Sequence, residues 1–213
     1  MHKRRLFAHL AAVGLFALAA GQAPVFAQSQ TPDALVRQVS SEVIDSVKAD
    51  KTIQAGDIRK IMALVEAKVL PHVNFQRMTA SAVGRYWRQA SPEQQERLQA
   101  EFKTLLVRTY SGALTQVHDQ TIELRPMRSK PDDTEVVVRT EVKGRGDTIQ
   151  LDYRLEKQPE GWRIYDVNVL GVWLVENYRN SFAQEISANG IDGLIAKLVE
   201  RNKAAAAKAS AKS

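Results

Sequence analysis

The chain has 213 residues and no cysteine, and its formal net charge of +6 lies at its two ends. Three basic residues stand in the first 27 positions and four in the last 13, while all 24 acidic residues lie between, so residues 28–200 hold 23 basic residues and a net charge of −1. A body of this size can form one domain with its own core, and its charge balance excludes the extended basic face that nucleic-acid binding requires.

The first 27 residues follow the pattern of a secretion signal. Residues 3–5 are basic, residues 10–20 form an uncharged and mostly apolar run, and Val25 and Ala27 provide small side chains at the −3 and −1 positions of a signal-peptidase site. The apolar run is shorter than the roughly 20 residues that a membrane-spanning helix needs. We therefore predict a signal peptide over residues 1–27, and a mature protein that is exported without a lipid anchor because the chain has no cysteine to carry one.

Apolar residues at helical spacing predict four helices in the first part of the mature chain. Pro32 opens the first of them, in the first turn, where its missing N–H costs nothing. Ser91-Pro92-Glu93-Gln94 has the pattern of a capping box and opens the longest one. The four helices are expected over residues 32–47, 54–70, 74–87 and 92–117.

The apolar period changes to two after His118, which indicates strands. The expected strands alternate with glycine-containing turns, which is typical of an antiparallel meander with one solvent-facing side. Two helices are expected to close the domain, one from near Gly171 and one after Gly190. The strands are expected over residues 122–126, 136–143, 149–156 and 162–169.

Helices, then strands, then helices indicate an α+β domain. We expect a curved antiparallel sheet of about four strands, packed with the N-terminal and C-terminal helices, which together enclose a hydrophobic cavity. The domain is expected over residues 28–200, and residues 201–213 form a low-complexity basic tail.

The sequence carries no recognisable catalytic or metal-binding motif. His72 and His118 are far apart, there is no thiol, and neither a nucleophile elbow nor a phosphate-binding glycine loop occurs. We therefore predict no catalytic residue, no metal and no cofactor. Two alternatives to a binding protein stay open at this point: an enzyme that uses Asp166 or Tyr165 on a small hydrophobic substrate, and a non-enzymatic scaffold with a filled core.

Two long motifs flank the predicted strands. The first, over residues 73–94, contains Asn74-Phe75-x-x-Met78 and Gly84-Arg85-Tyr86-Trp87-Arg88-x-Ala90-Ser91-Pro92. The second reads Gly161-Trp162-x-Ile164-Tyr165-Asp166-Val167-Asn168-Val169-x-Gly171-Val172-x-Leu174-Val175-x-Asn177-Tyr178-Arg179. Their order and spacing, with the signal peptide, resemble the MlaC family, also described as toluene-tolerance auxiliary proteins, over nearly the whole mature chain. The chain departs from the family pattern at Asn74, where aspartate is common, at Val83, where leucine is usual, and at Trp173, where serine is frequent.

The resemblance implies a periplasmic phospholipid-binding shuttle that carries phospholipid between the outer and inner membranes and so maintains outer-membrane lipid asymmetry. The phospholipid would be its cargo rather than a cofactor. The partners that the resemblance implies are an outer-membrane lipoprotein–porin complex and an inner-membrane ABC transporter with an MCE-domain subunit.

A carrier of this kind must replace the interior of a bilayer. Removing each methylene group of a lipid tail from water is favourable by about 0.8 kcal/mol, so the pocket must be deep and apolar. Pockets for small ligands reach about 1,000 Å³, and a whole phospholipid needs at least that volume, so we expect the head group to lie outside. Trp173 is expected to line or narrow the mouth of the pocket, and Arg85, Arg88 and Arg179 are candidates for contact with the head group. The expected lining comprises Phe75, Met78, Val83, Phe102, Leu106, Tyr110, Leu151, Tyr153, Val167, Val169 and Trp173.

Overall fold

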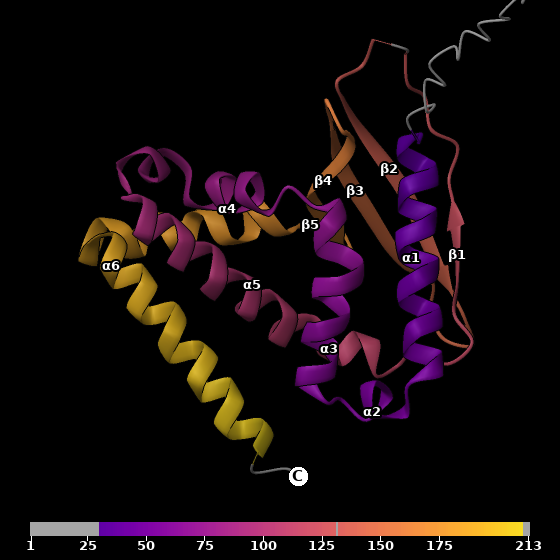
Figure 1. The fold of residues 1–213 in the computed structure, drawn as a ribbon, viewed down its shortest axis with the longest axis horizontal. Coiled ribbons are helices and arrows are strands. Elements are labelled where there is room, and N and C mark those ends of the chain that lie inside the picture. Colours follow the sequence, from indigo (N-terminus) through magenta and orange to yellow (C-terminus); the bar gives the residue numbers. More distant parts are fainter. Residues whose placement is uncertain (1–29, 131, 211–213) are drawn as a thin grey trace, which may run out of the picture.

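The computed structural model describes residues 30–130 and 132–210, and Figure 1 shows their arrangement. A sheet with helix α1 (Pro32–Ala49) across it occupies one side of the molecule, and a group of longer helices occupies the other side. The predicted α+β class is confirmed. The signal peptide predicted over residues 1–27 and the end of the basic tail lie outside the described residues.

The sheet is antiparallel and has five strands in the order of the sequence. Four of them are the predicted strands, and the fifth was missing from the prediction. Leu170 and Gly171 have φ angles of 52° and 90°, the pattern of a tight type I′ turn, so the chain folds back on β4 before the next helix begins. The expectation that a helix starts near Gly171 is wrong for this reason. The strands are β1 (Thr121–Leu124), β2 (Glu135–Lys143), β3 (Ile149–Gln158), β4 (Gly161–Val169) and β5 (Val172–Trp173).

A β-bulge in β4 decides which side chains face α1. The register between β3 and β4 shifts at this point: Leu155 pairs with Ile164, whereas Arg154 pairs with Asp166. Tyr165 is therefore the extra residue of the bulge. Strict alternation would place Ile164 and Val167 on opposite faces of the sheet. Because of the bulge, both side chains lie on the side of α1.

The segment after α1 is more broken than the single helix predicted for residues 54–70. Asp50 and Asp57 each cap a new helix with their carboxylates, which accept hydrogen bonds from the backbone N–H groups of Thr52 and Arg59 respectively. These interruptions let the chain turn and return along α1 (Figure 1). The resulting elements are α2 (Lys51–Gln54), α3 (Ile58–Leu64), the π-helical turn η1 (Val65–Val69) and the 3₁₀ turn η2 (Leu70–His72).

The other helices form a second hydrophobic core beside the sheet. The predicted capping box is present: the Ser91 side chain accepts from the Gln94 N–H, and the Gln94 side chain accepts from the Ser91 N–H. In the core, the fully buried Phe102 ring lies with its centroid 5.1 Å from that of Tyr178 and 5.3 Å from that of Phe182. This part comprises α4 (Phe75–Val83), the 3₁₀ helix η3 (Gly84–Gln89), α5 (Pro92–Leu114) and α6 (Leu174–Ser210), the last interrupted at Gly190, where two helices were predicted. Within residues 30–130 and 132–210, no helix is long and apolar enough to cross a membrane.

Candidate functional site: an apolar pocket between α1 and the sheet

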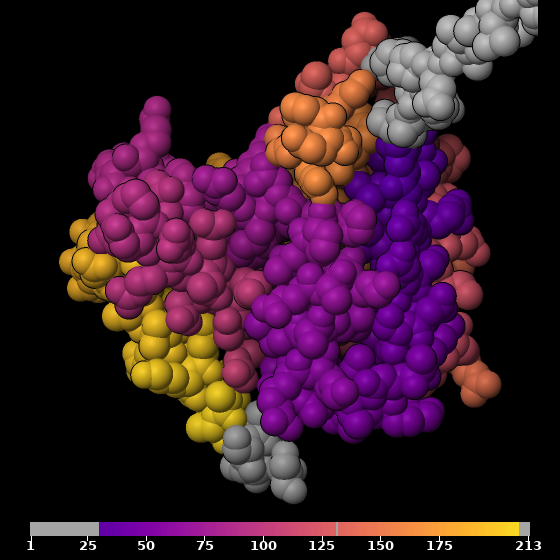
Figure 2. Space-filling view, in the orientation of Figure 1, coloured from indigo at the N-terminus to yellow at the C-terminus, as the bar shows by residue number. Residues whose placement is uncertain are grey.

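An apolar pocket of about 310 Å³ lies between α1, the inner face of the sheet and the end of α5. In the space-filling view of Figure 2, α1 and the chain from α2 to η2 cover the sheet on this side. The pocket therefore has a helical wall and a strand wall. Its lining is Val36, Val39, Ser40, Val43, Ile44, Val69, Val73, Ala113, Leu114, Gln116, Val117, Gln120, Ile122, Val142, Ile149, Leu151, Tyr153, Ile164, Val167 and Val169.

The lining contains few polar groups, and none of its described side chains is acidic or basic. Burial raises the pKa of the Tyr153 phenol above its usual value, and hydrogen bonding to the side chains of Ser40 and Thr140 opposes that shift. The phenol is therefore neutral at physiological pH, and the pocket presents an uncharged, largely hydrocarbon surface. Such a surface favours an apolar ligand, because a polar group placed here would lose its hydration without gaining new partners.

The structure divides the eleven expected lining residues into two main groups. Leu151, Tyr153, Val167 and Val169 line the pocket. Trp173 does not line the pocket. Its ring instead lies under the Arg154 guanidinium, whose Cζ is 3.9 Å from the ring centroid. The other six pack in or against the helical core: Phe75, Met78, Val83, Phe102, Leu106 and Tyr110.

The helical wall of the pocket was missing from the expected lining. Val36, Val39 and Val43 lie on the apolar stripe that predicts the first helix, so the sequence does contain a signal for this wall. A stripe of this kind is equally typical of an ordinary core helix. These three residues line the pocket because α1 packs across the sheet, which the sequence pattern does not reveal.

The volume of the pocket is well below the size expected from the sequence. Pockets for larger ligands reach about 1,000 Å³, whereas this pocket measures about 310 Å³. The expected cavity for a whole diacyl lipid is therefore absent from this conformation of the described chain. A ligand with two acyl chains could enter only if α1 and the sheet moved apart.

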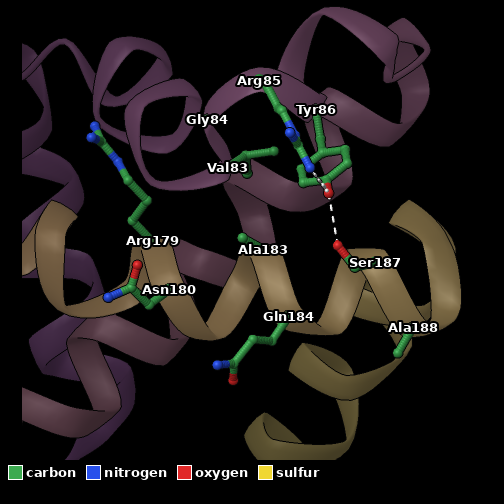
Figure 3. A pocket seen from close by; sticks show the side chains of 10 residues that line it. All are labelled: Val83, Gly84, Arg85, Tyr86, Arg179, Asn180, Ala183, Gln184, Ser187 and Ala188. Atoms are coloured by element: carbon green, nitrogen blue, oxygen red, sulfur yellow. Dashed lines mark hydrogen bonds between the residues drawn. The ribbon is translucent and has the colours of Figure 1, made fainter.

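The three candidate head-group arginines do not line the apolar pocket. Arg85 and Arg179 lie in an open groove of about 930 Å³ between η3 and α6, shown in Figure 3. Arg85 donates to the Tyr86 hydroxyl, which also hydrogen-bonds to Ser187, and these two contacts lower the pKa of Tyr86. Arg88 is exposed on η3 and lines neither site.

Asp166, the candidate acid or base, is buried, and both of its carboxylate oxygens accept hydrogen bonds. Its carboxylate is 1% exposed, and Oδ1 accepts hydrogen bonds from the backbone N–H groups of Val167, at 2.9 Å, and Val175, at 3.1 Å. Oδ2 accepts from the Arg154 guanidinium at 3.1 Å. Burial raises the pKa of Asp166, and the two backbone N–H groups oppose that shift. Since Val175 lies in the first turn of α6, the carboxylate fixes the start of that helix to β4.

Tyr165, the other candidate for catalysis, and Asn74, which departs from the family pattern, belong to one polar cluster. The Tyr165 hydroxyl donates to Glu135 at 3.0 Å, and the Arg77 guanidinium, which pairs with Glu135 and Glu156, lies over its ring. The Asn74 amide donates to Glu156 at 2.7 Å while its oxygen accepts from the Arg77 N–H. An aspartate at this position could not make the donation, so asparagine suits this network.

Residues 30–130 and 132–210 contain no cluster of three or more histidine, aspartate or glutamate side chains with the proximity that a metal ion requires.

Comparison with known proteins points to one family. Residues 37–200 match the family model described as MlaC protein. The chain is 23% identical over 172 residues to the intermembrane phospholipid transport system binding protein MlaC of Haemophilus influenzae, covering 79% of this chain and 80% of the relative. It is 28% identical over 181 residues to the toluene tolerance protein ttg2D of Pseudomonas putida, covering 84% of each. A solved phospholipid-binding protein from Ralstonia solanacearum, in complex with a phospholipid, superposes with a TM-score of 0.80 at 45% identity, covering 82% of this chain and 98% of that one.

Proposed function

The chain belongs to the MlaC family, and from this premise we propose that it is a phospholipid-binding shuttle whose acyl-chain site is the apolar pocket between α1 and the sheet. The observation that carries the proposal is the pocket itself, an uncharged hydrocarbon-lined space in a fold shared with a protein that was solved with a phospholipid bound. The cargo is a phospholipid. The protein works in the periplasm, to which residues 1–27 direct it.

The physical requirement on such a carrier is severe. Two chains of about 16 carbons, at about 0.8 kcal/mol per methylene, give an upper bound near 25 kcal/mol for keeping the tails out of water. A lipid leaves a bilayer only if the carrier offers an equivalent environment. The absence of charged side chains from the described lining of the pocket supports this role, because a single unpaired charge would cost several kcal/mol against hydrocarbon.

Loading requires the pocket to widen. At about 310 Å³ the pocket is too small for two acyl chains, so α1 and the sheet must separate as the tails enter. A hydrogen bond between Ser40 of α1 and Tyr153 of β3 joins the helix to the sheet and must break for the two to separate. Elsewhere on α1, the Lys48 ammonium donates to the Gln120 carbonyl, and Glu42 pairs with Lys68 on the surface, where an ion pair contributes little. The other side chains of α1 in the pocket lining are apolar, and a lipid tail can replace their contacts.

Transport between two membranes needs a donor and an acceptor. We assign these roles to an outer-membrane lipoprotein–porin complex and to an inner-membrane ABC transporter with an MCE-domain subunit. The shuttle passes lipid between them by diffusion and needs no catalytic step.

Extraction and identification of the co-purifying lipid tests the proposal. The mature protein, purified without detergent, is expected to release phospholipid when it is denatured and analysed by mass spectrometry. Recovery of the protein in folded form with no phospholipid, before and after incubation with phospholipid vesicles, would contradict the proposed function.

The substitution Asp166→Asn separates a carrier from an enzyme. Asparagine keeps an oxygen that can accept from the Val167 and Val175 N–H groups, so the fold is expected to survive with a loss of about 1–3 kcal/mol from the weakened Arg154 contact. Phospholipid should co-purify with the variant at the wild-type ratio, as measured by mass spectrometry. Hydrolysis of phospholipid by the wild-type protein that the folded variant lacks would instead indicate catalysis.

A further inference from the structure

The three large apolar side chains that are most exposed in the described chain lie together. Leu170 is 66% exposed, Val172 50% and Ile149 38%. The Leu170 N–H donates to the carbonyl of Gln150, next to Ile149, and Val172 pairs with Val169. We call the turn over residues 169–172, with Ile149, the Leu170 hairpin. Apolar side chains that gather on a surface in this way mark a place of contact with an apolar partner.

The backbone conformation at position 170 is unfavourable for leucine. Leu170 and Gly171 both have positive φ angles, as a type I′ turn requires, and the turn prefers asparagine followed by glycine. Leu170 is the one described residue other than glycine with a positive φ. A leucine here costs conformational energy and leaves its side chain in water, so stability does not explain its presence.

The Leu170 hairpin continues the lining of the apolar pocket onto the surface. Ile149 lines the pocket and is also exposed, so the pocket reaches solvent at this residue. Val169 lines the pocket as well and pairs with Val172 in the hairpin. Two apolar residues of the pocket lining, Ile149 and Val169, therefore lie directly beside the exposed apolar residues of the turn.

We infer that the Leu170 hairpin dips into the hydrocarbon region of a lipid bilayer while a phospholipid tail enters or leaves the pocket; this inference rests on the proposed function. Three side chains cover far less than the roughly 800 Å² that each partner of a stable protein complex contributes. The patch is thus suited to a brief, shallow contact. Residues 28–200, which include the hairpin, have a net charge of −1, and the four basic residues of the tail lie in the C-terminal part of α6 or follow it in the sequence. The contact at the hairpin is therefore expected to depend on apolar burial rather than on attraction to anionic lipid.

A fluorescent label at a unique cysteine tests the contact directly. Because the chain has no cysteine, Leu170→Cys can be labelled at one site with the polarity-sensitive dye NBD, with Gln184→Cys in the arginine-lined groove as the matched control. With vesicles of phosphatidylethanolamine and phosphatidylglycerol, the emission at position 170 is expected to rise and shift to shorter wavelength at both low and high salt, and that at position 184 to stay unchanged. An unchanged signal at position 170, or an equal change at both sites, overturns the inference.

Leu170→Asn tests the function of the contact without endangering the fold. Asparagine suits the type I′ turn, so the variant should unfold at the same or a higher denaturant concentration than the wild type. Its rate of phospholipid exchange with the same vesicles should fall on the order of tenfold, because one large apolar contact is lost from the bilayer-bound state. Its content of co-purified phospholipid should stay at the wild-type level.

The outcomes separate this inference from the proposed function. If the wild type exchanges phospholipid with vesicles and Leu170→Asn does so at the same rate, the inference fails and the shuttle function stands. If the wild type neither holds nor exchanges phospholipid, both fail. A change in the NBD signal that follows protein concentration without vesicles identifies a second copy of the chain as the occupant and overturns the bilayer contact.

Discussion

Val169→Glu is expected to empty the pocket of lipid while the protein stays folded. Val169 lines the pocket from β4 and lies opposite Leu151 of β3. A carboxylate here would have to stay protonated or lie unpaired against hydrocarbon, which costs several kcal/mol when a tail is present. The affinity for phospholipid should therefore fall at least about a hundredfold. The ratio of phospholipid to protein after purification, measured by mass spectrometry, checks this expectation.

Val137→Glu is the matched control for the Val169 variant. Val137 lies on β2 between Val136 and Val138, which pack on the α1 side, so alternation directs its side chain to the outer face of the sheet. The same substitution there should leave the phospholipid ratio unchanged. Normal phospholipid content in folded Val169→Glu, or an equal loss in both variants, would show that the acyl chains lie elsewhere.

Phe102→Ala is expected to weaken the fold without changing the site. Phe102 is fully buried in the helical core against Phe75, Tyr178 and Phe182, and it does not line the apolar pocket, so its removal leaves a cavity inside the helical core. The free energy of unfolding should fall by about 3–5 kcal/mol, as measured by denaturant titration of delipidated protein. The folded fraction should still take up phospholipid from vesicles at the wild-type ratio.

Phe102→Leu provides the comparison for the alanine variant. It retains most of the buried volume, so its loss of stability should be smaller while uptake again stays unchanged. If both variants lose uptake in proportion to the volume removed, while stability hardly changes, then the ring lines the acyl-chain site. In that case the division of the molecule into a helical core and a separate pocket is wrong.

The helices and strands could be predicted because their signals are local. The capping box at Ser91 and the alternation of β2 and β3 depend on neighbours within a few residues, and both are present in the structure. The fifth strand could not be predicted, because it depends on Leu170 adopting a positive φ that leucine disfavours. The single helix expected over residues 54–70 failed at Asp57, whose carboxylate caps a new helix.

The site was harder to predict than the fold, because periodicity indicates that a residue is buried but not what it is buried against. Phe102 and Val167 both lie on apolar faces, yet the first lies inside the helical core, whereas the second packs against that core and also lines the pocket. The bulge at Tyr165, which brings Ile164 and Val167 to the same face, leaves no mark in the apolar pattern. The position of α1 across the sheet is a long-range feature that no local pattern contains.

Only one of the two family motifs contributes pocket residues that were expected of it. The second motif places Asp166 where it joins β4 to the first turn of α6, and it supplies Val167 and Val169 to the pocket. Much of the first motif builds the helical core, to which Met78 and Val83 belong. A motif can therefore identify the family even where most of its residues stabilise the fold around the pocket instead of lining it.

Contacts between lipid tails and protein methyl groups, measured by NMR, would show whether the acyl chains lie between α1 and the sheet. The protein would be loaded with a phospholipid carrying ¹³C-labelled acyl chains, and nuclear Overhauser effects from these chains to valine, leucine and isoleucine methyl groups would be recorded. We expect strong effects to Val43 on α1 and to Leu151 and Val167 on the sheet, and none to Leu98 or Leu198 in the helical core. Effects to Leu98 and Leu198 without any to Val43 would contradict a site between α1 and the sheet.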